Sequence, residues 1–165
     1  MLGSEKQPKL FKGALIGDSP EMYFADNIEQ TVKAVNFIID QAWEAGYESI
    51  QILTTKTEAS SIIAGECSTG VYTYKTKKIP FTTCRKYKGL EADVVIMVDL
   101  DEYTFNEQSE YVLYVGSSRA RYKLHLISNV TEEGCKSLLE KFSGRKTRKP
   151  WKAFAAMYNA KYIDM

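Results

Sequence analysis

The sequence predicts an α/β domain with a mostly parallel sheet. Apolar residues recur at helical spacing over residues 28–43, and a short apolar strand follows at 49–54. A helix joined this closely to a strand is typical of an α/β unit. Two later apolar runs, at 93–99 and 123–128, have the composition of strands that are covered on both faces of a parallel sheet. We expect one domain over residues 1–165, because no internal repeat or Gly/Ser linker divides the chain.

The first elements are predicted from capping and turn residues. Residues 1–9 are expected to form a loose lead-in. Asp26 is the predicted N-cap of the first helix, with Glu29 reaching back as its capping-box partner. Gly46 is the predicted end of this helix.

The remaining elements are predicted from periodicity and from residues that favour strands. We expect a short helix over 58–64, strands over 71–74 and 79–83, a helix over 108–121, a helix over 131–142 capped by Thr131, and a last helix over 151–162 opened by Pro150.

Composition and charge exclude several classes of protein. Lys plus Arg is 22 and Asp plus Glu is 21, which excludes a uniformly basic DNA-coating protein but allows a local basic groove. No apolar run approaches the roughly 20 residues that span a membrane, and we expect no signal peptide. Three cysteines without a CxxC pair argue against disulfides or a zinc site, so we expect a reducing, cytoplasmic setting. His125 is the single histidine and is expected to be structural.

Charge is arranged in blocks along the chain. Residues 75–88 and 141–152 each hold six basic residues and no acid, whereas residues 91–118 hold seven acids and no base. Such blocks usually form solvated faces, but two basic blocks in one small domain also favour a surface that follows a phosphate backbone. Residues 143–165 are expected to form a basic loop and a packed C-terminal helix, the alternative being a flexible arm that contacts DNA.

One candidate ligand-binding segment, residues 82–91, immediately precedes the first of the two buried strands. Loops at strand ends carry ligands in open α/β sheets, and Gly89 lets the backbone approach a ligand closely. Thr83 supplies a hydroxyl, Lys88 a positive charge and Glu91 two acceptor oxygens. On composition alone, a polar loop around a turn glycine is an equally good interpretation.

A second candidate segment, residues 114–121, places Gly116–Ser118 inside a predicted helix. These small residues lower helix propensity by about 1–2 kcal/mol relative to alanine, and they permit close approach of another backbone or a ligand. Arg119 presents a rigid guanidinium fork that suits bidentate contact with phosphate. The alternative is a tight contact between helix and sheet with an exposed arginine beside it.

Three acids after the first buried strand resemble a magnesium site. Asp99, Asp101 and Glu102 follow the apolar residues 94–98, as acids do in a magnesium–nucleotide site. Such a site also needs a phosphate-binding GxxxxGK[ST] loop, which the sequence lacks. We therefore expect a polar strand end and no metal ligands.

The two segments together carry a family resemblance. The pattern Thr83-x4-Lys88-Gly89-Leu90-Glu91, an apolar strand, the run 113–120 (LYVGSSRA) and a second apolar strand follow one another in order. This arrangement resembles motifs V and VI of superfamily 1 DNA helicases of the UvrD/Rep kind, and residues 51–63 resemble the weaker motif IV. The resemblance covers residues 22–130. It implies a RecA-like three-layer sandwich with helices on both faces, as the second, C-terminal motor domain of an ATP-driven helicase.

The resemblance assigns a nucleotide-binding role to three residues. Arg119 aligns with the arginine that reaches across a cleft to the γ-phosphate of ATP, which makes it the candidate catalytic residue. Gly89 and Glu91 align with positions that contact the nucleotide. ATP with magnesium is the implied cofactor, but only beside the first motor domain of the same polypeptide, which carries the P-loop. The chain by itself is therefore expected to be inactive.

The resemblance also implies single-stranded DNA as a partner and no membrane. Thr83 aligns with a threonine that touches the phosphate backbone of the strand. Cys84 stands where many relatives have histidine, so that contact is weakened or is replaced by Arg85 or Lys86. Lys88 completes the predicted nucleic-acid contacts.

Two further departures keep other interpretations open. Ser61 stands where motif IV usually ends in an arginine, and Lys56 is a candidate substitute. The short stretch between motifs IV and V leaves no room for the large accessory domain of many relatives. One alternative is a non-catalytic nucleic-acid-binding module with a degenerate nucleotide half-site, and another is an α/β signalling or interaction domain.

Overall fold

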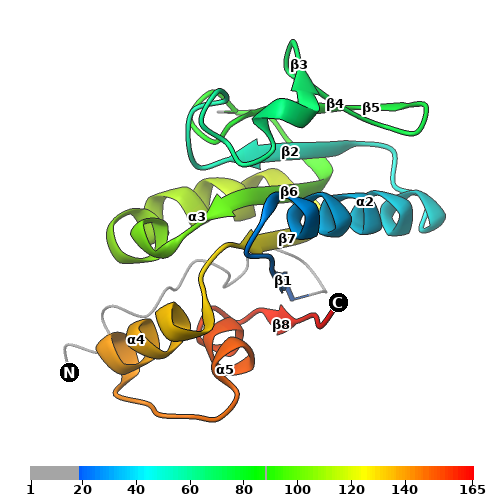
Figure 1. The fold of residues 1–165 in the computed structure, drawn as a ribbon. Helices are drawn as coiled ribbons and strands as arrows, with labels where there is room; N and C mark the ends of the chain where they lie inside the picture. The colour runs from blue at the N-terminus through cyan, green and yellow to red at the C-terminus, as the bar shows by residue number, and fades with distance from the viewer. Residues whose placement is uncertain (1–18, 88) are drawn as a thin grey trace.

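The computed structural model describes residues 19–87 and 89–165. The predicted lead-in at 1–9 and Lys88 lie outside the described residues. The described chain forms an eight-stranded sheet in the order β3-β4-β5-β2-β6-β7-β1-β8 (Figure 1). The strands are β1 (Glu21–Phe24), β2 (Ile50–Thr54), β3 (Cys67–Ser68), β4 (Val71–Tyr74), β5 (Lys77–Thr83), β6 (Ala92–Leu100), β7 (Ala120–Ser128) and β8 (Lys161–Tyr162).

The sheet is mostly parallel, as predicted. Strands β5, β2, β6, β7, β1 and β8 pair in parallel, and only the β3–β4–β5 end is antiparallel. Every residue of β2 and β6 is buried, which explains why both strands are mostly apolar.

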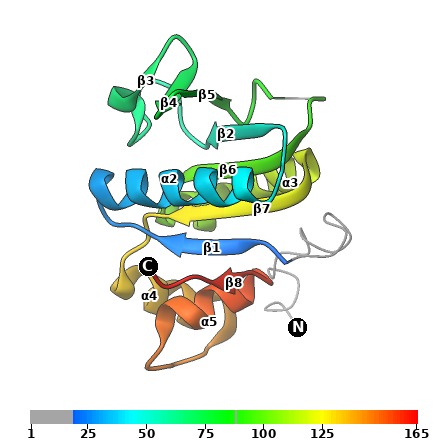
Figure 2. The same cartoon turned by 90° about the vertical axis from the view of Figure 1, so that its right-hand side faces the viewer.

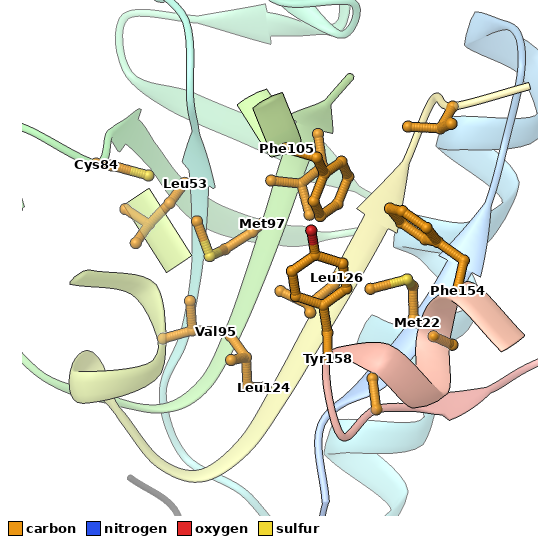
Figure 3. Close-up of a cluster of buried hydrophobic side chains, with 14 of the residues drawn as sticks. Met22, Leu53, Cys84, Val95, Met97, Phe105, Leu124, Leu126, Phe154 and Tyr158 are labelled. Carbon is orange, nitrogen blue, oxygen red and sulfur yellow. The ribbon is translucent and has the colours of Figure 1, made fainter. Parts of the chain in front are cut away.

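Helices cover both faces of the sheet (Figures 1 and 2). Helix α2 (Ile28–Glu44) packs its buried side on one face, against side chains such as Ile52 and Ile96. Helices α3 (Ser109–Arg119), α4 (Glu132–Ser143) and α5 (Pro150–Met157) contribute to the core on the opposite face. Figure 3 shows this second core, in which Phe154 of α5 lies beside Phe105 and Tyr158. The three-layer α/β architecture predicted from the sequence is confirmed.

The first helix begins one residue later than predicted. Asn27, not Asp26, is the N-cap, and its side chain accepts a hydrogen bond from the Gln30 amide at 2.8 Å. Gln30 reaches back to the Asp26 amide at 3.1 Å, so Glu29 is not the capping-box partner. Backbone pairing with β7 continues to Ala25, and the chain therefore turns into the helix later than the pattern suggested.

Two other helix predictions are wrong, one for residues 58–64 and one for the end of the last helix. Residues 58–64 form turns that lead into a short 3-10 helix, Ala64–Glu66. The last helix ends at Met157 rather than continuing to residue 162. The chain turns at Asn159, with a φ of +56°, and then pairs with β1 as β8. By contrast, Thr131 caps α4 as predicted, accepting a hydrogen bond from the Gly134 amide at 3.1 Å.

Gly116 sets how closely α3 approaches the sheet, and its replacement tests this packing. A Cβ at Gly116 would overlap the Sδ atom of Met97, which is fully buried in β6. We expect Gly116→Ala to lower the free energy of unfolding by about 1–3 kcal/mol, measured by urea denaturation. Gly65→Ala is the control, since no atom lies within 4 Å of its Cβ position. Equal stability of the two variants would contradict this packing.

Candidate functional site

The predicted site residues lie at two opposite edges of the sheet. Thr83 ends β5 in register with Thr54, and Thr54 is in register with Val98 near the end of β6. Glu91 directly precedes Ala92, the first residue of β6. The six-residue step from Ala92 to Val98 spans about 20 Å. The segment predicted as one ligand loop therefore connects two edges of the sheet. The carboxyl edge is the one at which the parallel strands end, near Thr83, and the amino edge is the one at which they begin, near Glu91.

A groove of about 590 Å³ lies at the carboxyl edge. The loops that follow β2, β5 and β6 line it, through residues 54–58 and 83–86 and through Asp101, Tyr103 and Thr104. This groove brings together three of the residues predicted to bind nucleic acid: Thr83, Arg85 and Lys86. It also contains Tyr103, whose side chain is 61% exposed and which the sequence interpretation missed.

Ion pairs hold most of the groove's cations loosely in place. Lys56 lies 3.3 Å from Asp101, and Lys86 lies 3.6 Å from Glu58. Burial alone would raise the pKa of Asp101, but hydrogen bonds from Thr104 and the ammonium of Lys56 lower it. The two lysines are exposed, and exposed pairs contribute little, so phosphates can replace the carboxylates as partners.

Arg85 and Thr83 offer contacts that internal partners do not occupy. Arg85 is exposed, and its guanidinium has no partner among the described residues. Thr83 accepts a hydrogen bond from the Lys86 amide at 3.1 Å, which orders the turn and leaves its hydroxyl proton available to an acceptor. Both arrangements suit an anionic ligand. Tyr103 adds a ring on which a base can stack.

Cys84 does not face this groove with its thiol. The residue is 2% exposed, and its side chain lies in the core beside Leu53 and Met97 (Figure 3). Burial raises the pKa of the thiol to about 12. Cys84 is therefore a packing residue, and the cationic side chains beside it that line the groove are Arg85 and Lys86.

Asp99 holds the loop after β2, which forms one wall of the groove. Its side chain is buried and accepts hydrogen bonds from Thr54 Oγ1 (2.6 Å), Ser61 Oγ (2.6 Å) and the Ile62 amide (2.8 Å). The β6–β7 pairing shifts register at this point, and Asp99 has a φ of +66°. This irregularity aims the carboxylate at the loop after β2. Ser61 thus has a structural role in holding the loop after β2.

Arg119 ends α3 at the amino edge, where Ala120 pairs with Ala92. Its Nε atom is buried without a hydrogen-bond partner, and no acid pairs with it among the described residues. Arg121, two residues later, lies 3.3 Å from Glu91 and 3.5 Å from Asp93. The hydrogen bond to Glu91 is the main cause of a raised pKa at Arg121. Of these two arginines, Arg119 is the one without an acidic partner among the described residues.

The other predicted nucleotide residues differ in availability. Gly89 has a φ of +77° and open space around its Cβ position, so the backbone there is accessible to a ligand. Glu91 is exposed but is engaged by Arg121, which was not predicted. No group of three or more metal-binding side chains occurs in the part of the chain that the structure describes.

The structure thus defines a mostly parallel α/β domain with an available arginine at one edge and a basic groove at the other. Residues 79–127 match a family model described as the UvrD-like helicase C-terminal domain. This segment contains both motif segments, and the match confirms the resemblance read from the sequence. The structure is also similar to a solved structure, the C-terminal domain of a possible DNA helicase from Lactobacillus plantarum WCFS1.

This solved structure aligns with a TM-score of 0.53 and 24% sequence identity, over 76% of this chain and 84% of the other. At this identity, the likeness supports the fold alone. No curated protein matches the chain significantly. No helix among residues 19–87 and 89–165 is long and apolar enough to cross a membrane.

Proposed function

We propose that this chain is the C-terminal motor domain of an ATP-dependent superfamily 1 DNA helicase or translocase. Its partner is the first motor domain of the same polypeptide, which supplies the P-loop and the other wall of the ATP cleft. The observation that carries the proposal is Arg119, whose buried Nε atom has no hydrogen-bond partner and which lies within the segment that matches the helicase model.

The amino edge is suited to half of a nucleotide site. Arg119 would stabilise negative charge on the γ-phosphate, a role for which its rigid fork is suited. Gly89 would expose backbone to the same ligand. ATP and magnesium would be held chiefly by the first motor domain, because this sequence has no GxxxxGK[ST] loop.

The carboxyl edge is suited to single-stranded DNA. Arg85 and Lys86 would contact the phosphate backbone, Thr83 would donate its hydroxyl proton to a phosphate oxygen, and Tyr103 would stack on a base. Strand β6 and its neighbours join this groove to the nucleotide edge across about 20 Å of buried sheet. Closure of the cleft around ATP would therefore move the groove as part of one rigid body.

ATP turnover separates half a motor from a complete enzyme. We expect the purified 165-residue chain to show negligible ATP turnover, with or without single-stranded DNA, because Arg119 then has no bound γ-phosphate to contact. The longer polypeptide with its first motor domain is expected to hydrolyse ATP and to be stimulated by single-stranded DNA. Turnover by the isolated chain that depends on Arg119 would contradict the proposal.

A non-catalytic binding module is the second candidate, and the pairing of Glu91 with Arg121 favours it. That pairing occupies a carboxylate that the nucleotide would otherwise use. Salt-sensitive binding of single strands by the longer polypeptide, unaffected by ATP or its analogues, would support this alternative.

A further inference from the structure

The two basic blocks of the sequence have different surroundings in the structure. In the first block, Lys75 lies 3.3 Å from Asp40, and the ammonium of Lys77 lies 3.1 Å from the centre of the Trp43 ring. Both partners belong to α2, so this part of the block is used to hold the β4–β5 hairpin against the helix. Of the described cations in this block, Arg85 and Lys86 are the ones that line the carboxyl-edge groove.

The second block lies on the connection between α4 and α5, and its charge is largely uncompensated. Arg145, Arg148, Lys149 and Lys152 are exposed, and their side chains have no partner among the described residues. Only Lys146 approaches an acid, Glu140, at 4.0 Å, and both of these side chains are exposed.

The ends of this connection are fixed. Gly144, with a φ of +65°, ends α4, and the Thr147 hydroxyl accepts a hydrogen bond from the Lys149 amide at 3.1 Å. Pro150 is buried at the start of α5, and Trp151 packs against Phe24 with ring centroids 6.0 Å apart. The cations therefore lie on a defined loop beside a packed helix.

A hydrogen bond links the last turn of α4 to the turn that follows β6, one end of which lines the carboxyl-edge groove. Lys141, in the last turn of α4, donates a hydrogen bond to Asn106 Oδ1 at 2.6 Å. Asn106 belongs to a π-helical turn, Thr104–Gln108, whose first residue lines the groove. Figure 1 shows the end of α4 on the same side of the molecule as the carboxyl ends of β2 and β6. Arg145 comes directly after Gly144, the left-handed residue that ends α4, and is the first cation of the connection.

We propose that the α4–α5 connection is a second nucleic-acid site, which takes the sugar–phosphate backbone of a strand beyond the carboxyl-edge groove. The choice of a nucleic acid as the occupant rests on the function proposed above. A phosphate backbone is bound by cations that are not neutralised by neighbouring acids. Residues 141–152 contain six basic residues and no acid. An acidic protein partner fits less well, because no large exposed apolar side chain in this block could anchor a protein interface.

The test compares three variants of the 165-residue chain on single-stranded oligonucleotides of increasing length, from about 6 to about 20 nucleotides. The loop variant is Arg145→Gln/Arg148→Gln/Lys149→Gln, and the groove variant is Arg85→Gln. Lys33→Gln/Lys136→Gln/Lys161→Gln is the control, because it removes the same charge from exposed positions outside both sites. Fluorescence anisotropy gives the dissociation constants, and thermal denaturation checks that each variant is folded.

We expect the loop variant to bind long oligonucleotides about tenfold or more weakly than the control, and to bind the shortest ones equally well. Its salt dependence on long oligonucleotides should be shallower by about 2 in log–log slope, since three phosphate contacts are lost. Affinity equal to the control at every length would overturn the second site. An equal loss at every length would also overturn it, because the loop would then be the primary site.

The groove variant reports separately on the function proposed above. It is expected to weaken binding to short and long oligonucleotides alike, because both occupy the groove. If it leaves both unchanged, the groove assignment fails, whatever the result for the loop variant.

Discussion

Replacing Arg119 with alanine in the longer polypeptide is expected to lower single-stranded-DNA-stimulated ATP turnover by at least about a hundredfold. An arginine finger stabilises charge that develops on the transferred phosphoryl group, and such residues contribute about 10³–10⁵ in rate. Arg119 suits the role because its guanidinium has no acidic partner among the described residues. Steady-state ATPase assays at saturating DNA measure the effect.

Two further variants test whether the activity depends on the bidentate geometry of the Arg119 guanidinium or only on its positive charge. Arg119→Lys keeps the charge without the bidentate geometry and is expected to recover only part of the activity. Arg121→Ala is expected to cost less than about tenfold, because Glu91 and Asp93 already engage that guanidinium. Unchanged turnover in folded Arg119→Ala protein would mean that the motif VI match misleads, and would favour the binding-module alternative.

Replacing Asp99 with alanine is expected to have the largest effect on stability, lowering the free energy of unfolding by about 2–5 kcal/mol. The carboxylate is buried and accepts three hydrogen bonds, so its removal leaves the Ile62 amide and two hydroxyls without their acceptor. Alanine also fits poorly at a φ of +66°. Urea denaturation of the purified chain measures the loss.

Asp26→Ala is the matched control for this substitution. Asp26 is exposed and precedes the N-cap of α2, so its loss is expected to cost less than about 1 kcal/mol. Equal stability of the two variants would show that the loop behind the groove does not depend on Asp99.

The elements that the sequence predicted best are those with a continuous local signal. Strand β6 is buried along its whole length and β7 over residues 124–128, and α2 has an apolar stripe at helical spacing. Strands β1 and β8 were missed because they are short and gain their stability from pairing with each other and with β7. The segment at 58–64 was wrongly assigned to a helix. Its conformation depends on hydrogen bonds to Asp99, which lies 37 and 38 positions away in the sequence, and a local pattern does not show such contacts.

The site was predicted by residue but not by arrangement. The motifs identified Thr83 and Arg119, yet the sequence could not show that they lie at opposite edges of the sheet. Nor could it show that Arg121, rather than Arg119, pairs with Glu91, since ion pairing depends on the contact between two strands. Tyr103 had one usable signal, an aromatic residue directly after the acids at the end of a strand.

We propose that the amino edge of the sheet serves ATP and that the carboxyl edge serves DNA. The most direct test measures both ATP turnover at saturating single-stranded DNA and the DNA dissociation constant, in the longer polypeptide carrying Arg119→Ala or Arg85→Gln. We predict that Arg119→Ala loses turnover while its DNA affinity stays within about twofold, and that Arg85→Gln weakens DNA binding but keeps most of its turnover at saturation. The opposite pattern, or the same loss of both properties in both variants, would contradict the division of function between the two edges.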